Sequence, residues 1–185
     1  MIDPGEEPRT LIDAIAEGGW RVKEILFTHA HIDHVAGAAE VQRQTGAPVA
    51  MHAADRGLYE SLAEQAAWIG IPTPERVEIA RWLEEGEELA CGSLRLKVLF
   101  TPGHAPGHVS FYLAEHAMLI SADVLFRASI GRTDLPGGNH PELLESIRTK
   151  LLTLPDETRV IAGHGPATTI GLERRTNPFL EDASF

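Results

Sequence analysis

The stretch that most constrains this chain is Thr28-His29-Ala30-His31-Ile32-Asp33-His34, which holds four potential metal ligands within six residues. It follows the apolar run Ile25-Leu26-Phe27, which predicts a buried strand, and it precedes a predicted helix. In an extended backbone, side chains two residues apart point the same way, so His29 and His31 are expected to serve one ion. The next pair, Asp33 and His34, opens the helix and could serve a second ion. A polar loop with solvated histidines is the simpler alternative, and this spacing after an apolar strand favours the metal site.

Three later segments place a potential ligand at the end of a predicted strand. They are His104 in Thr101-Pro102-Gly103-His104, Asp123 after Ser121-Ala122, and His164 in Gly163-His164-Gly165. Flanking Gly and Pro residues permit tight turns and close backbone approach, which a crowded metal site needs. Each segment alone also fits an ordinary turn or helix cap, so the prediction depends on their repetition.

These seven side chains suffice for two metal ions. His29, His31 and His104 would supply three nitrogens to one ion, while Asp33, His34 and His164 would bind the other. Asp123 could give one oxygen to each ion. Zinc accepts such donors, although iron or manganese could use the same ligands. Two cations would lower the pKa of a shared water and polarise a carbonyl, which favours hydrolysis of an activated acyl compound.

Composition and charge narrow the class of protein. The 185 residues are 43% hydrophobic, which suits a single domain over 1–185. A net charge of −11 argues against partners such as nucleic acid or an anionic membrane. The single cysteine, Cys91, excludes an intramolecular disulfide and favours a reducing compartment. Because we find neither an apolar run of ~20 residues nor a signal segment, we predict a cytoplasmic protein.

Hydrophobic periodicity predicts a mixture of helices and strands. Helices are predicted over 9–17, 35–44, 54–68 and 141–152, and strands over 21–27, 48–52, 94–100, 109–113, 118–121 and 159–162. Residues 71–86 could form a lid, a rim or only a connection. The pattern favours an α/β (α+β) fold, in which helices with one apolar face cover sheet layers.

The ligand motifs, in order and spacing, resemble those of the metallo-β-lactamase superfamily. The runs 129–138 and 176–180 are similar to the compact bacterial glyoxalase II-like branch, and the resemblance covers essentially the whole chain. It implies a four-layer αββα sandwich with a dinuclear site at one edge of the sheets, with Asp33 and Asp123 as catalytic residues. It also implies hydrolysis of a small-molecule thioester, S-(2-hydroxyacyl)glutathione, typically S-lactoylglutathione. In that family the first His of the Thr-Pro-Gly-His run is a ligand and the later one is not. The resemblance therefore selects His104 as the ligand and implies a supporting or structural role behind the ligands for His108.

Four departures from the family pattern bear on the expected function. Arg132 stands where glyoxalase II enzymes have a glutathione-binding Lys, and it could grip a carboxylate or be a surface turn residue. Ala122 replaces the usual Gly before the bridging Asp and should barely crowd the site. The family normally has further strands before the segment that starts here at Met1, and the larger enzymes add a C-terminal glutathione-binding domain. The first strands are therefore expected to be lacking: either the chain is truncated at its start, or an open sheet edge could pair two copies into a homodimer. Without the C-terminal domain, a related ester or thioester could replace the glutathione thioester as the substrate.

Other polar and aromatic residues are assigned ordinary roles. We expect surface or turn positions for His52, His116 and His140 and a helix cap at Asp55. For Asp3 a turn is the first interpretation, and a side chain that supports the metal ligands is the second. Core or rim packing is expected for Trp20, Trp68 and Trp82, of which the last two could line a substrate groove.

Four other functions compete with thioester hydrolysis. A mononuclear iron persulfide dioxygenase, from a neighbouring family, would need only His29, His104 and Asp123, whereas the complete second ligand set favours hydrolysis. A nucleic-acid phosphoesterase is disfavoured by the acidic charge, and a β-lactamase is supported only by the shared ligands. A non-enzymatic metal-binding module is the remaining alternative.

Replacing the shared ligand tests this ligand choice. Asp123→Ala should abolish turnover, because it removes the oxygen that both ions share, whereas His108→Ala should reduce turnover much less. Steady-state kinetics with metal analysis of both variants would check this. Equal losses at normal metal content would mean that the ligands are chosen wrongly.

Overall fold

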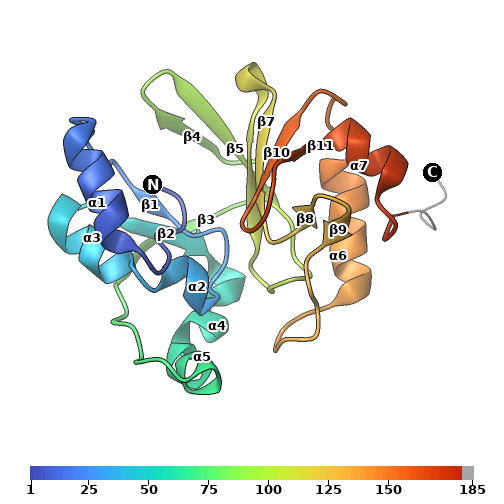
Figure 1. Cartoon of the computed structure of the whole chain (residues 1–185). Helices are drawn as coiled ribbons and strands as arrows, with labels where there is room; N and C mark the ends of the chain where they lie inside the picture. Colours follow the sequence, from blue (N-terminus) through green and yellow to red (C-terminus); the bar gives the residue numbers. More distant parts are fainter. Residues whose placement is uncertain (181–185) are drawn as a thin grey trace. The chain divides into compact units, whose positions relative to one another are not determined.

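The computed structural model describes residues 1–180 and divides into two compact units, Met1–Leu83 and Glu84–Phe185. Each unit combines a β-sheet with helices, so the predicted mixed α/β class is confirmed (Figure 1). The assignment of 1–185 to a single domain stays a prediction. Among the described residues, no helix has the length and apolar character needed to cross a membrane.

The first unit is built on a three-stranded parallel sheet of order β1-β2-β3. The strands are β1 (Ile25–Leu26), β2 (Val49–His52) and β3 (Ile79–Leu83). Ile2 adds a parallel bridge to Leu26 on the β1 side. The predicted strand 21–27 is therefore shorter than expected, and β3 lies in the segment 71–86 that periodicity could not interpret.

Six short helical segments accompany this sheet. They are α1 (Pro8–Glu17), α2 (Ile32–Val35), α3 (Ala38–Thr45), η1 (Ala53–Asp55), α4 (Arg56–Glu60) and α5 (Leu62–Ile69). Apolar side chains from the sheet and from α3 and α5 form one core, including Phe27, Val41, Met51 and Leu62. This core fixes the segment between β1 and α2, where the histidine stretch lies.

The predicted helix 35–44 is interrupted at Gly37 for a steric reason. The Gly37 N–H donates to the Pro4 carbonyl over 2.9 Å, and a Cβ at Gly37 would lie 2.4 Å from the Gly5 oxygen. The N-terminal turn therefore packs directly on the backbone between α2 and α3. The predicted helix 54–68 is likewise divided, at Ser61, whose hydroxyl donates to the Leu58 carbonyl.

The second unit contains a six-stranded sheet of order β11-β10-β7-β6-β5-β4. Its strands are β4 (Glu88–Cys91), β5 (Leu94–Phe100), β6 (Val109–Leu113), β7 (Met118–Ala122), β10 (Arg159–Ala162) and β11 (Thr168–Thr169). The β7–β10 pair is parallel, and the other pairs are antiparallel. The predicted strands 94–100, 109–113 and 159–162 are confirmed with their bounds. A small hairpin of β8 (Leu125–Phe126) and β9 (Ser129–Ile130) follows β7.

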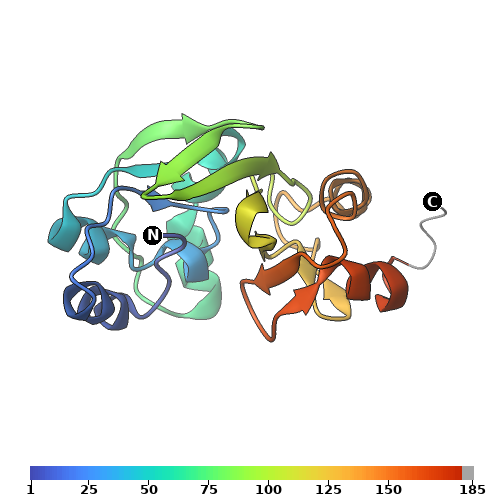
Figure 2. The same cartoon turned by 90° about the horizontal axis from the view of Figure 1, so that it is seen from above.

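Helices α6 (His140–Ser146) and α7 (Ile170–Thr176) pack against the six-stranded sheet (Figure 2). The first continues as a π-helical turn, η3 (Ile147–Leu151), which together with α6 accounts for the predicted helix 141–152. Leu143 and Ile147 pack in one core with Leu119 of β7 and Val160 of β10. The sequence did not predict α7.

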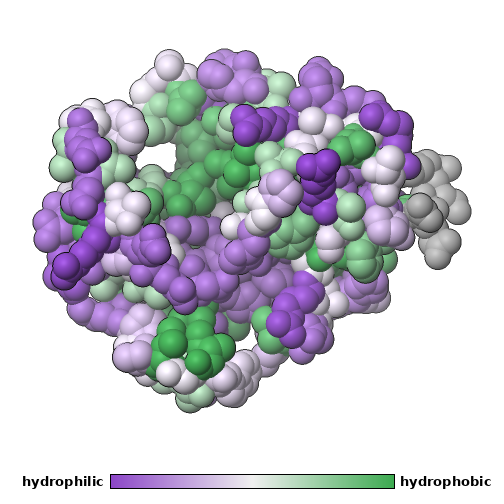
Figure 3. Space-filling model, in the orientation of Figure 1, coloured by the Kyte–Doolittle hydropathy of each residue, from purple (hydrophilic) through white to green (hydrophobic). Residues whose placement is uncertain are grey.

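Two tryptophans are exposed, which excludes the core among the expected positions and leaves the rim. Trp20 and Trp68 are 69% and 63% exposed, so neither lies in a core. Figure 3 shows hydrophobic surface over α5, where Ile69 and Ile71 are also exposed. Trp82 is partly buried and lies beneath the Arg56 guanidinium, 5.0 Å from the ring centroid.

Ala122, at the end of β7, has a backbone conformation that its side chain disfavours. Its φ is +40°, in the left-handed region, and the residue is 2% exposed. The replacement of the usual Gly therefore acts on backbone strain, because a Cβ is disfavoured at positive φ. This strain lies immediately before Asp123.

Ala122→Gly should raise the free energy of unfolding by about 0.5 to 1 kcal/mol, because relief of left-handed strain exceeds the entropy lost with Gly. The matched control Ala90→Gly, in β4, should lower it by a similar amount. Denaturant unfolding of both variants measures the difference. If Ala122→Gly lowers the free energy of unfolding as much as the control does, no backbone strain is stored at position 122.

Candidate metal centre

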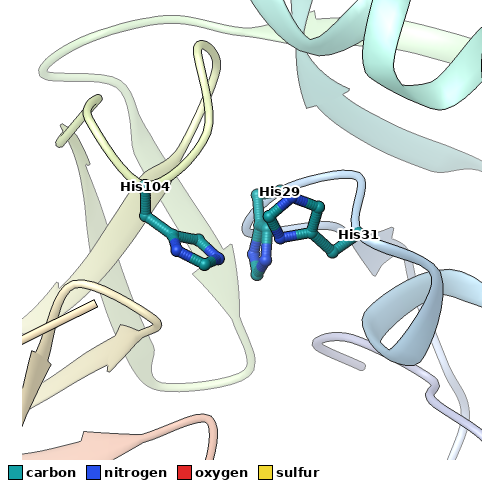
Figure 4. Close-up of side chains that lie close together, drawn as sticks. All are labelled: His29, His31 and His104. Carbon is teal, nitrogen blue, oxygen red and sulfur yellow. The ribbon is translucent and has the colours of Figure 1, made fainter. Parts of the chain in front are cut away.

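The histidine stretch lies on the loop after β1 and on the first turn of α2. His29, His31 and His34 are 1%, 7% and 5% exposed. Their rings pack together, with centroids 4.7 Å apart for His29 and His31 and 4.1 Å apart for His29 and His34. Figure 4 shows the first two on this loop, and it shows His104 on a loop of the second unit. Three buried imidazoles in one cluster are the donor type that zinc and iron prefer.

Asp3 fixes the orientation of two of these rings. Its carboxylate accepts hydrogen bonds from the Thr28 amide (2.7 Å), the Thr28 hydroxyl (2.6 Å) and His34 Nδ1 (2.9 Å). Since Thr28 gives its only hydroxyl proton to Asp3, its oxygen must accept from His29 Nδ1 at 3.0 Å. Both rings therefore carry their proton on Nδ1 and direct Nε2 away from this network. Carboxylate and hydroxyl partners at one ring nitrogen are typical of metal-binding histidines.

Asp55 and Gln65 hold the backbone of the same loop from behind. The Asp55 carboxylate, fully buried, accepts from the Ala30 amide over 2.8 Å. The Gln65 oxygen accepts from the Ile32 amide over 3.0 Å, and its nitrogen donates to the Ala30 carbonyl over 3.2 Å. Asp55 stands at the N-cap position of α4, as expected, but its side chain makes no cap hydrogen bond and binds the histidine loop instead. Together the two side chains fix the residues on either side of His31.

In the second unit, Asp123 lies between two predicted histidine ligands. Its Oδ2 atom is 3.6 Å from His104 Nε2 and 3.7 Å from His164 Nε2. His104 is 3% exposed, whereas the side chain of His164 is 60% exposed on the loop after β10. Three loops at strand ends thus bring His104, His164 and the Asp123 carboxylate together, as the sequence predicted for this unit.

The loop after β9 orients His104 and approaches Asp123. His104 Nδ1 donates to the Arg132 carbonyl over 2.8 Å, so the proton is again on Nδ1. A Cβ at Gly131 would lie 2.0 Å from the Asp123 carbonyl oxygen, so only Gly fits there. The Arg132 side chain is 61% exposed and pairs with Asp134 over 2.7 Å.

His108 supports Asp123 through its backbone. His108 Nε2 accepts from the Asp123 amide over 3.3 Å, which places the ring proton on Nδ1, 3.1 Å from the Thr101 hydroxyl. The same hydroxyl lies 2.9 Å from Ser110 Oγ. His108 therefore engages both ring nitrogens within the second unit, in agreement with its expected place behind the ligands.

The donor sets fit divalent metal ions. In the first unit, ligand atoms of Asp3, His29 and His34 lie within 4.8 Å of one another, but Asp3 is the orienting partner on the Nδ1 side of these rings, so the atoms offered to an ion are the Nε2 nitrogens. Asp33 is the most exposed predicted ligand of this unit, with 40% side-chain exposure and an oxygen 3.7 Å from His34 Nε2. The ligand roles of all seven residues, and the substrate role of Arg132, stay predictions. Of the remaining histidines, His116 and His140 are exposed as expected, and His52 accepts from the Ala54 amide.

Sequence reasoning does not identify two of the three side chains that hold the histidine loop, Asp55 and Gln65. For Asp3 a supporting role is the second interpretation, after a turn. A signal existed for Asp3, because it precedes Pro4-Gly5 at the start of a segment that bridges to β1. No local pattern marks Gln65 or Asp55, since their contacts reach across 33 and 25 residues.

Comparison with known proteins gives concordant matches. A family model described as the metallo-beta-lactamase superfamily matches residues 1–164. Hydroxyacylglutathione hydrolase GloC of Haemophilus influenzae is 44% identical over 186 residues, covering 100% of this chain and 88% of that protein. The crystal structure of BLEG-1 B3 metallo-beta-lactamase has a TM-score of 0.91 at 41% identity, covering 97% of this chain and 87% of that one. TTHA1623 in a di-iron-bound form has a TM-score of 0.89 at 47% identity, with 97% and 88% coverage.

Removing the Gln65 contacts should weaken metal binding more than it weakens the fold. Gln65→Leu should raise the zinc dissociation constant about 10- to 100-fold, because the histidine loop loses its backbone partners. Tyr59→Phe is the matched control, since the Tyr59 hydroxyl makes similar contacts to Val77, away from that loop. Chelator competition gives the zinc affinity, and thermal unfolding gives the stability. The same affinity loss in both variants would contradict a positioning role for Gln65.

Proposed function

This chain is a metallo-hydrolase of the metallo-beta-lactamase superfamily, and we propose that it hydrolyses thioesters of the S-(2-hydroxyacyl)glutathione type. S-lactoylglutathione is the proposed substrate, and the products are a hydroxy acid and glutathione. The observation that carries the proposal is the set of buried imidazoles whose Nδ1 atoms are held by Thr28, Asp3 and the Arg132 carbonyl. Such rings are prepared to bind metal through Nε2.

The proposed ligands form two sets that share one carboxylate. His29, His31 and His104 would hold one ion, Asp33, His34 and His164 the other, and Asp123 both. Nitrogen and oxygen donors of this kind favour zinc, although the di-iron form of a similar protein makes iron the alternative. Divalent ions bound there would lower the pKa of water into the neutral range and polarise the thioester carbonyl.

Residues around the proposed metal ligands hold those ligands in place. Asp3 and Thr28 keep two imidazoles in the tautomer that presents Nε2. The Asp123 amide donates to His108, and Gly131 packs closely against the Asp123 carbonyl. These contacts fix the Asp123 backbone, and its carboxylate lies beside His104. Fixed positioning of this kind lowers the entropic cost of reaction.

Support for a glutathione thioester comes from two directions. The similarity to the GloC hydrolase extends over the whole chain. In addition, Arg132 presents a guanidinium next to a ligand-bearing loop, and glutathione carries two carboxylates that a guanidinium can bind bidentately. A persulfide dioxygenase would use one iron and a smaller ligand set, so the second set, with Asp33, His34 and His164, favours hydrolysis.

Metal content measured together with a hydrolysis assay tests the proposal. The purified protein should contain two divalent ions per chain and should hydrolyse S-lactoylglutathione, and removal of metal with a chelator should abolish the activity. Elemental mass spectrometry and release of free thiol are the measurements. One iron per chain with oxygen uptake on glutathione persulfide would contradict the hydrolase, as would a metal-loaded protein that hydrolyses no thioester.

A further inference from the structure

The backbone of Arg132 is fixed to the ligand-bearing loops of its own unit. Its carbonyl accepts from His104 Nδ1 over 2.8 Å, and the preceding Gly131 amide donates to the Val124 carbonyl over 3.1 Å. Gly131 also lies against the Asp123 backbone so closely that no Cβ would fit. The backbone from which the Arg132 side chain extends is therefore fixed beside His104 and Asp123.

The guanidinium of Arg132 is engaged by a neighbouring carboxylate. Arg132 Nε donates to Asp134 Oδ1 over 2.7 Å, and its terminal nitrogen donates to Asp134 Oδ2 over 2.8 Å. Hydrogen bonding to Arg132 lowers the pKa of Asp134 to about 2, so this carboxylate is ionised at neutral pH. Two parallel N–H···O bonds are the geometry in which a guanidinium binds any carboxylate, including that of a ligand.

We propose that Asp134 is a specificity-determining residue whose carboxylate occupies the place on Arg132 that a substrate carboxylate takes. This inference rests on the proposed function and adds the substrate class that Arg132 selects. A thioester with a carboxylate on its thiol portion must displace Asp134, whereas an uncharged thioester has no need to do so. Asp134 therefore weakens the binding of anionic substrates alone.

The degree to which Asp134 weakens the binding of anionic substrates depends on how exposed the Arg132–Asp134 pair is. The Arg132 and Asp134 side chains are 61% and 69% exposed. Exposed ion pairs are weak, so a substrate can displace Asp134 at modest cost, equivalent to about a fivefold change in affinity at most. The pair thus adjusts affinity without closing the site, and salt should reduce its influence by screening.

Asp134→Asn in the full-length, metal-loaded protein tests the inference. The variant should show a KM for S-lactoylglutathione that is about two- to fivefold lower. Its KM for the lactoyl thioester of N-acetylcysteamine, which has no carboxylate, should not change. Calorimetric titration with S-methylglutathione, a thioether that cannot be hydrolysed, should show the same gain in affinity without depending on turnover.

Two further variants separate this effect from general changes in charge. Glu145→Gln removes one negative charge from the exposed Glu145–Arg148 pair of the same unit, and it should leave both KM values unchanged. In an Arg132→Gln background, Asp134→Asn should no longer improve S-methylglutathione binding.

The outcomes distinguish this inference from the proposed function. Hydrolysis of both thioesters with an unchanged or higher KM for S-lactoylglutathione in Asp134→Asn would overturn the inference and leave the hydrolase intact. Failure to hydrolyse either thioester would overturn the proposed function, while the thioether titration would still test Asp134. Equal affinity of wild type and variant for S-methylglutathione, or no binding to either, would overturn the inference directly.

Discussion

The hydrogen-bond network around the Asp3 carboxylate is the interaction on which the candidate metal centre depends. One side chain that is 13% exposed accepts from a backbone amide, a hydroxyl and an imidazole. Because a carboxylate can only accept, the proton positions of the whole network follow from it, and His29 and His34 must present Nε2. Asp3 itself has φ of +44°, a conformation that Asp tolerates better than most residues. A strained backbone and a preset pair of imidazoles thus occur together at one turn.

The two units hold their predicted ligands by different means. In the first, two buried side chains, Asp55 and Gln65, bind the backbone amides beside His31. In the second, the backbone itself is the support, since the Arg132 carbonyl orients His104 and the Asp123 amide is held by His108. Partners of this kind fix the tautomer and direction of a metal-binding ring, and their loss weakens metal binding. The chemistry proposed for this chain therefore depends on residues well outside the ligand motifs.

The sequence predicts features that depend on neighbouring residues, whereas the features that it does not predict depend on contacts between residues far apart in the chain. The alternation over 94–100 and the apolar run before His29 are short-range signals, and both correspond to strands or buried segments. The breaks at Gly37 and Ser61, the strand β3, and the contacts of Asp55 and Gln65 depend on tertiary packing, which no window of sequence contains. Asp55 is an example, because Asp before a helix is typical of a cap, whereas the buried Asp55 carboxylate binds the backbone of the histidine loop. The ligand motifs can be recognised in the sequence because metal chemistry restricts residue type and spacing together, and their ligand roles stay predictions.

The central claim is that the protein itself fixes the protons of His29, His34 and His104 on Nδ1, and thereby reserves Nε2 for metal. Nitrogen-15 NMR of the histidine rings during zinc titration tests it most directly. We expect all three rings to keep a protonated Nδ1 and the Nε2 resonance of each to shift when zinc binds. Binding of zinc through Nδ1, or imidazoles whose tautomers interchange freely in the metal-free protein, would contradict it.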